Sequence, residues 1–108
     1  MIIMLDRKFL LGFVRVHILH HANQEHIYGV WLIDELARHG YDMSPGTLYP
    51  ILHELEKDGF LVSDKRVVKG KVRKYYIITK NGKDMLRRSK QQVRSLLDEL
   101  DEGPFRLN

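Results

Sequence analysis

Cysteine is absent from the 108-residue chain, which excludes a disulfide framework, a thiolate zinc site and a thiol nucleophile. A chain without cysteine suits a reducing compartment, and we therefore expect a cytoplasmic protein. Prolines number only three, and no segment is repeated or of low complexity. The length corresponds to one domain of ordinary size.

Long hydrophobic runs are lacking as well. The most apolar stretch, residues 1–19, contains Asp6, Arg7, Lys8 and Arg15, which excludes a transmembrane helix there. No small-residue cleavage site follows its first apolar residues, so we expect neither a secretory signal nor a membrane partner. The chain has no glycine-rich phosphate loop and no H-E-x-x-H sequence, and no motif surrounds any Ser/His/Asp set. We therefore expect neither an enzyme nor a cofactor.

Acidic residues are scarce in one region. Of the 18 Lys and Arg residues, 11 lie between Asp64 and Lys90, together with only 2 of the 14 Asp and Glu residues. The rest of the chain is net negative. Positive charge concentrated in one stretch favours a polyanionic partner, with nucleic acid first and anionic lipid second. A basic surface that is merely solvated is the alternative interpretation.

Hydrophobic periodicity and capping residues predict three helices in the first half of the chain. The first covers residues 6–21, with Asp6 as N-cap and apolar side chains around most of its axis. After a polar loop, the second covers residues 27–39 and ends at Gly40. The third begins with Ser44 as N-cap and ends at Gly59, and its core stripe is Leu48, Ile51, Leu52 and Leu55.

In the second half of the chain, the residue pattern predicts a basic β-hairpin and one more helix. Strands are expected at residues 60–66 and 72–79, where β-branched and aromatic residues are frequent, with a turn at 67–71. Thr79 is expected to cap a helix over residues 80–100. Three helices followed by a hairpin is the order of a winged helix-turn-helix. We therefore predict a mainly α, α+β fold, with a DNA-binding domain at 1–79 and a C-terminal dimerisation helix and tail at 80–108.

Several motifs resemble one family. They are Ser44-Pro45-Gly46-Thr47-Leu48-Tyr49-Pro50-Ile51-Leu52, Leu55-Glu56-Lys57-Asp58-Gly59-Phe60-Leu61, Tyr28-Gly29, and Arg73-Lys74-Tyr75-Tyr76 with Thr79 and Gly82. Together they resemble the PadR-like transcriptional regulators over about residues 10–86. The resemblance implies a homodimeric winged-helix repressor whose third helix and wing contact operator DNA. Dimer symmetry in turn favours a palindromic operator, and release by a small effector is a further possibility. The single C-terminal helix resembles the short members of that family.

The candidate DNA-binding residues lie on the third helix and on the hairpin, or wing: Ser44, Thr47, Tyr49, Pro50, His53, Lys65, Arg66, Lys69, Lys71, Arg73 and Lys74. Hydroxyl groups near a helix N-terminus suit phosphate contacts, and clustered Lys and Arg suit the DNA backbone. Tyr49 packing under the wing is an equal alternative, and Glu54 is interpreted as solvated rather than base-reading. Lysines that only protect a strand edge are the alternative for the wing.

An apolar stripe on the last helix predicts a dimer, since nothing else in the chain is expected to cover it. The candidate interface residues are Phe9, Phe13, Leu86, Val93, Leu96, Leu97 and Leu100. Trp31 has two interpretations: an ordinary packing residue, which is favoured, or one wall of an effector pocket at that interface.

Histidines form the remaining cluster. His17 and His21 share a helix face, with His20 and His26 nearby in sequence, but metal binding is the minority interpretation. Three hypotheses follow. A DNA-binding regulator is favoured, a winged-helix module that binds protein is the alternative, and a histidine-based metal sensor comes third.

Overall fold

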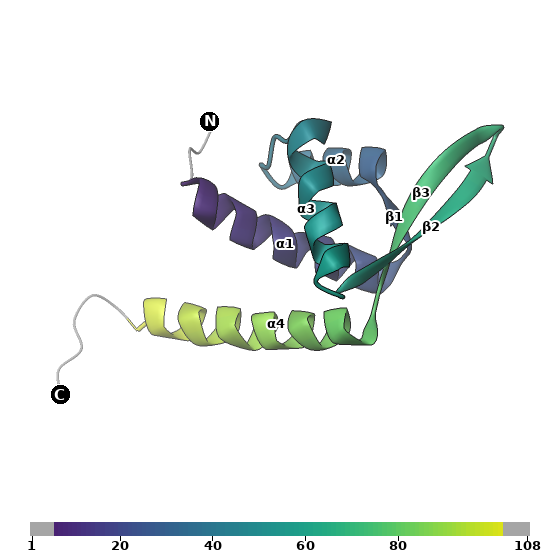
Figure 1. Cartoon of the computed structure of the whole chain (residues 1–108). Coiled ribbons are helices and arrows are strands. Elements are labelled where there is room, and N and C mark those ends of the chain that lie inside the picture. The colour runs from purple at the N-terminus through teal and green to yellow at the C-terminus, as the bar shows by residue number, and fades with distance from the viewer. Residues whose placement is uncertain (1–5, 103–108) are drawn as a thin grey trace.

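The computed structural model describes residues 6–102, which form four helices and a three-stranded antiparallel sheet (Figure 1). In chain order the elements are α1 Arg7–Gln24, β1 Ile27–Tyr28, α2 Gly29–Arg38, α3 Pro45–Lys57, β2 Leu61–Val68, β3 Lys71–Ile78 and α4 Lys80–Leu100. The α+β class expected from the sequence is confirmed. No helix among the described residues is both long and apolar enough to cross a lipid bilayer.

Helix α1 begins as predicted and ends later. The Asp6 carboxylate accepts a hydrogen bond from the Lys8 backbone N–H at 2.8 Å, which is the expected N-cap. The helix then continues to Gln24, so the polar loop predicted at residues 22–26 is too long. Both His21 and Ala22 are buried, and their burial against the core extends the helix beyond its predicted end.

The prediction of one helix over residues 27–39 is wrong at its start. Ile27 and Tyr28 form β1, which pairs with β3 at Tyr76 and Tyr75. Helix α2 begins only at Gly29. The partner strand lies far away in the sequence, and Ile27 is 1% exposed. Tertiary pairing therefore overrides the helical periodicity that continues through these two residues.

The wing is longer than predicted because its turn is shorter. Lys69 and Gly70 have φ values of 51° and 77°, and they alone connect β2 to β3. Two residues with positive φ match the twist of a hairpin, a conformation that glycine adopts without strain. The five-residue turn predicted at 67–71 is therefore wrong, and Val67, Val68 and Lys71 belong to the paired strands.

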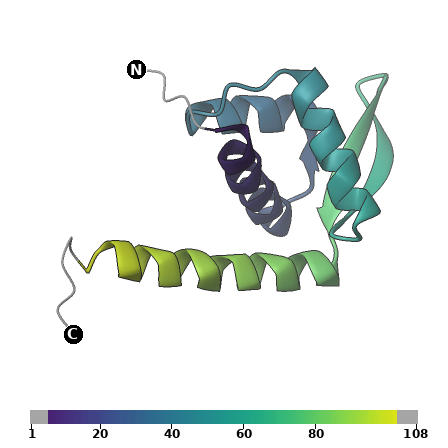
Figure 2. The same ribbon diagram turned by 60° about the vertical axis from the view of Figure 1, so that its left-hand side comes forward.

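The core lies where α1, α2, α3 and the inner face of the sheet meet. Figure 2 shows α1 between α4 on one side and the pair α2 and α3 on the other. Val14 and Ile18 of α1 are completely buried, as the all-round apolar pattern of this helix predicts. The α3 stripe predicted from the sequence, Leu48, Ile51, Leu52 and Leu55, is buried as expected.

Helix α4 packs against this core with its first turns and then runs beyond it. The Thr79 hydroxyl accepts from the Gly82 N–H at 3.0 Å, which is the predicted cap, and donates to the Gly59 carbonyl at 2.6 Å. Met85 and Leu86 pack against the core. From residue 90 onwards the helix is exposed within the chain. The division into 1–79 and 80–108 stays a prediction, and tail residues 103–108 lie outside the described part.

Gly82 lies tightly against the winged helix at the start of α4. A methyl group there would overlap the Phe60 carbonyl oxygen and the Ile78 side chain. Gly82→Ala should therefore lower the free energy of unfolding by about 1–3 kcal/mol, because a backbone carbonyl cannot move aside. Gly46→Ala in α3 is the matched control, since its nearest neighbour would lie at 3.8 Å. Thermal unfolding of both variants checks this, and an unchanged Tm for Gly82→Ala would contradict it.

Candidate nucleic-acid interface

The outward face of α3 carries the residues predicted to approach DNA. Ser44, Tyr49, Pro50 and His53 are exposed and Thr47 is half-buried. Ser44 occupies the N-cap position, but its hydroxyl lies 3.2 Å from the Thr47 hydroxyl and makes no capping hydrogen bond. Pro45 has no N–H, and the Thr47 N–H donates to the Ser44 carbonyl at 3.1 Å. This leaves the Gly46 N–H, in the first turn of α3, available to an anion such as a DNA phosphate.

Tyr49 is held in place by the start of α2. Its ring and hydroxyl lie so close to Gly29 that a methyl group there would overlap them. The ring remains 36% exposed. Packing and DNA contact are therefore compatible for Tyr49, and the start of α2 is one of its packing partners.

The strand register divides the wing cations between two faces. Paired residues of β2 and β3 share a face, and the pairs alternate. Lys65 and Lys74 lie on the face that also carries buried Leu61 and Tyr76, the side of the sheet that covers α3 and the core. Arg66 and Arg73 are paired on the opposite face, and Lys71 shares it.

Both arginines are engaged with aromatic rings. The Arg66 guanidinium lies 4.4 Å from the Tyr75 ring centre, and that of Arg73 lies 4.1 Å from the Tyr28 ring centre. Arg66 also pairs with Asp64 at 3.0 Å and approaches His26 Nδ1 at 2.6 Å. Such contacts are attractive because the cation lies over the negative face of the ring. These two arginines therefore brace the outer face of the wing.

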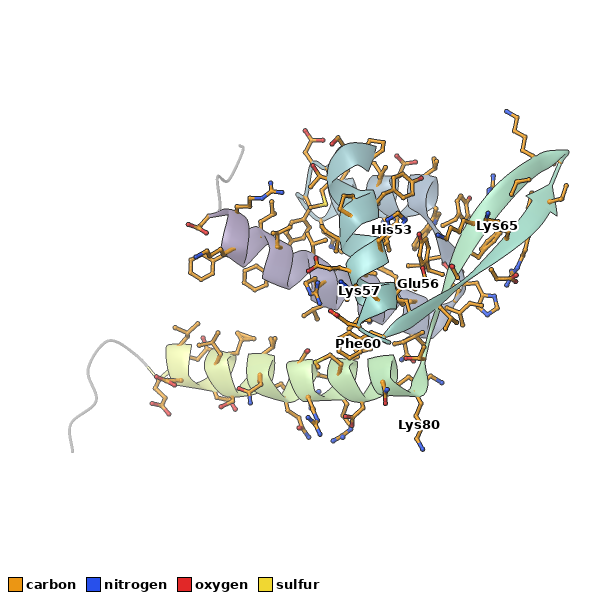
Figure 3. All side chains as sticks on the ribbon, viewed as in Figure 1. His53, Glu56, Lys57, Phe60, Lys65 and Lys80 are labelled. Atoms are coloured by element: carbon orange, nitrogen blue, oxygen red, sulfur yellow. The ribbon has the colours of Figure 1, made fainter. Side chains whose placement is uncertain are left out.

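The lysines are the freer cations. Lys65, Lys69 and Lys71 are exposed, whereas Lys74 is half-buried with its ammonium 4.0 Å from Glu56. Figure 3 shows Lys65 on the wing, well away from Lys80 at the start of α4. Lys65 is exposed on the wing face that covers α3, and Lys69 is exposed at the wing tip. These two lysines are therefore the best placed of the predicted set to reach phosphates beside α3.

Glu56 joins α3 to the wing, and sequence reasoning missed it. One carboxylate oxygen accepts from both the N–H and the hydroxyl of Ser63, at 3.1 and 2.7 Å. The other faces the Lys74 ammonium. Figure 3 shows Glu56 between the helix and the strands. The family motif that contains Glu56 does not indicate this role, because its partners Ser63 and Lys74 come from two strands that only the fold brings to it.

A second surface, of apolar character, lies between α1 and α4. A groove of about 410 Å³ is lined by both helices, including Phe9, Phe13 and Val93. The exposed fractions of the predicted interface residues are large for apolar side chains: Phe9 65%, Phe13 46%, Val93 43%, Leu96 54%, Leu97 50% and Leu100 68%. Leu86 differs, because it is half-buried against its own chain's core. Its predicted full exposure is therefore wrong.

The histidine cluster is assembled differently from the sequence expectation. His26 lies apart at Arg66, whereas His39 of α2 approaches His17, with ring centres 5.1 Å apart. His21 is 8% exposed, and its ring meets Trp31 edge to face at 5.4 Å. Trp31 is half-buried on α2 and does not line the α1–α4 groove.

Burial lowers the pKa of both His17 and His21, and neighbouring histidines lower it further. For His17 these neighbours are His39, His21 and His20, and Glu35 opposes them. For His21 they are His20 and His39, opposed by Glu35 and Glu25. The neutral imidazole is therefore the favoured form of both residues in the folded chain.

A three-helix core, an α3 with an open outward face and a basic two-stranded wing together define a winged helix-turn-helix DNA-binding protein. Residues 18–88 match the Transcriptional regulator PadR-like family. The chain belongs to this family and is a DNA-binding transcriptional regulator, not an enzyme.

Named relatives agree with this assignment. The chain is 49% identical over 97 residues to the transcriptional regulator Rv3488 of Mycobacterium tuberculosis, covering 90% of this chain and 91% of that protein. A Streptococcus transcriptional regulator has a TM-score of 0.80 at 30% identity, over 89% and 96% of the two chains. A PadR family regulator from Eggerthella lenta has a TM-score of 0.77 at 33% identity, over 88% and 84%.

Half-buried His17 and buried His21 predict acid sensitivity. Because their pKa values lie below the ordinary 6.5 in the folded chain, the unfolded chain binds more protons on acidification. Their contribution to stability is fully present above pH 6.5 and is lost as pH falls towards the folded pKa values. In EDTA, Tm should therefore fall between pH 7.5 and 5.5. The fall should be smaller in His17→Gln with His21→Gln, and unchanged in His53→Gln, which alters an exposed residue. An equal pH dependence in all three proteins would contradict the assignment.

Proposed function

We propose that this regulator is a homodimeric repressor, with α3 and the wing of each subunit contacting one half of a palindromic operator. The DNA-binding part rests on one observation: the exposed outward face of α3 lies beside the wing face that carries Lys65. Lys69 is exposed at the wing tip. Lysines supply affinity for phosphates, and α3 sets the position of the protein on the major groove. No arginine is present on α3, so the wing carries much of the affinity.

The dimer part is supported by the apolar groove and the exposed stripe of α4. Isolated apolar side chains on a surface are ordinary, but here they are contiguous across two helices. A second copy of the chain, related by a two-fold axis, covers the exposed apolar residues of both α1 and α4. In such a dimer each subunit contributes the same surface to the interface. Two-fold symmetry in turn favours a palindromic DNA site.

Repression requires only that the dimer occupy its operator and exclude other proteins. We place this activity in the cytoplasm, because the named relatives come from bacteria, whose DNA lies there. The alternative of a winged helix that binds protein instead of DNA leaves the lysines next to α3 without a role.

The contribution of the wing is tested by a matched pair of double variants. Lys65→Ala with Lys69→Ala should weaken binding to a selected operator and to random duplex alike, and flatten the log–log salt dependence by about 0.9 for each lost phosphate contact. Lys80→Ala with Lys83→Ala removes the same charge from the start of α4 and should leave both unchanged. Fluorescence anisotropy at several salt concentrations measures these values. An equal loss in both double variants would show that only net charge matters and would favour the protein-binding alternative.

Assembly is tested on the α4 stripe. Val93→Asp with Leu100→Asp should convert a dimer into a monomer at micromolar concentration, because each carboxylate would be buried without a partner. Gln91→Asp with Ser95→Asp adds the same charge on the opposite side of the helix and should leave the dimer intact. Sedimentation velocity distinguishes the two states. A wild-type chain that sediments as a monomer would remove the dimer proposal.

A further inference from the structure

His21, Glu35 and His39 bring three ligand atoms together between α1 and α2. These atoms all lie within 4.8 Å of one another. The Glu35 carboxylate oxygen Oε1 is 4.0 Å from His21 Nε2 and 3.5 Å from His39 Nε2. Two imidazoles and one carboxylate therefore converge on a single point.

The second observation is the state of His21 itself. Its Nε2 is buried and has no hydrogen-bond partner among residues 6–102, although it points towards Glu35. A buried polar atom without a partner costs about 1–3 kcal/mol, and such atoms are uncommon unless something satisfies them. A metal ion at this point gives the lone pair of that nitrogen a partner.

The surroundings orient the ligands. Arg38 holds the other oxygen of Glu35, Oε2, at 3.1 Å, which leaves Oε1 directed at the histidines. The Trp31 ring lies edge to face against His21 and limits the positions that its imidazole can take. Contacts of this kind, one shell beyond the ligands, normally fix the orientation of metal-binding side chains. His39 is half exposed, so an ion can enter from its side.

We propose that His21, Glu35 and His39 form a binding site for a divalent first-row transition-metal ion such as Zn²⁺. Imidazole with one carboxylate suits this class of ion, whereas Ca²⁺ and Mg²⁺ require mostly oxygen ligands. Three protein ligands leave a fourth position for water, as in other three-ligand zinc sites. Bond lengths of about 2.0–2.2 Å require the three atoms to move closer, and the exposed His39 side chain has the freedom to do so.

Such an ion ties two helices together. His21 lies near the end of α1, and His39 is the C-cap of α2, directly before the turn that leads to α3. Because the ligands approach each other only in the folded chain, the ion binds the folded state and stabilises it. The site lies apart from the DNA-facing surface and does not depend on the proposed repressor activity.

The site is tested with the full chain, freed of any affinity tag and treated with chelator. Calorimetric titration with Zn²⁺ should give one ion per chain, and Co²⁺ should produce the visible absorption bands of a tetrahedral site. Glu35→Gln and His39→Gln should each weaken Zn²⁺ binding at least tenfold, and the Zn²⁺-dependent rise in Tm should disappear with them. His21→Gln should do the same. If His21→Gln fails to fold because His21 is buried, Glu35→Gln and His39→Gln, which change more exposed side chains, still test the site.

Controls separate this trio from unspecific binding to histidine. His26→Gln and His53→Gln lie outside the cluster and should bind Zn²⁺ as the wild type does. His17→Gln, next to the trio, should weaken binding less than any of the three ligand variants. Zn²⁺ affinity that survives in Glu35→Gln and His39→Gln, or that falls equally in the control variants, would overturn the proposal.

Discussion

The burial of β3 at the centre of the sheet is the constraint on which the rest of the structure depends. This strand pairs with β1 on one side and with β2 on the other. Its inward residue Tyr76 is 1% exposed and anchors the sheet to the core. Once β3 is fixed, the wing projects at one end, and Thr79 at the other end starts α4 beside α1. The positions of the wing lysines and of the apolar α4 stripe both follow from this one strand.

The wing shows how one cluster of positive charge is divided into two roles. Alternation along the strands sends Arg66 and Arg73 to the face where Tyr75 and Tyr28 lie, and their planar guanidinium groups stack there. Lysine, a compact and strongly hydrated charge, occupies the positions nearest to α3 and the tip. The arginines therefore support the shape of the wing, while the lysines remain available to phosphates. Composition alone counts both sets as a single basic patch.

The two ends of α1 carry different features because different elements pack against them. Near its beginning, Phe9 and Phe13 face the groove beside α4 and remain exposed within one chain. Near its end, His21 is enclosed by α2, where Glu35 and His39 meet it. The polar cluster of His21, Glu35 and His39 therefore lies at the contact between α1 and α2. The apolar groove, which suits a second copy of the chain, lies at the other end of α1. His39 therefore contacts α1 and also ends α2, and α3 begins at Pro45 a short turn later.

The sequence by itself determined the features that depend on neighbouring residues. The caps at Asp6 and Thr79, the core stripe of α3 and the basic hairpin all follow from local hydrogen bonding and periodicity, and each was predictable. Glu35 and His39 also have a visible i, i+4 spacing on α2, but that spacing does not indicate that His21 meets them. Only the tertiary structure decided this meeting, the pairing of β1 with β3, the link from Glu56 to Ser63 and the face that each wing cation occupies. Each of these joins residues that are distant along the chain, and the free energy that holds them together arises from burial and pairing that no local segment contains.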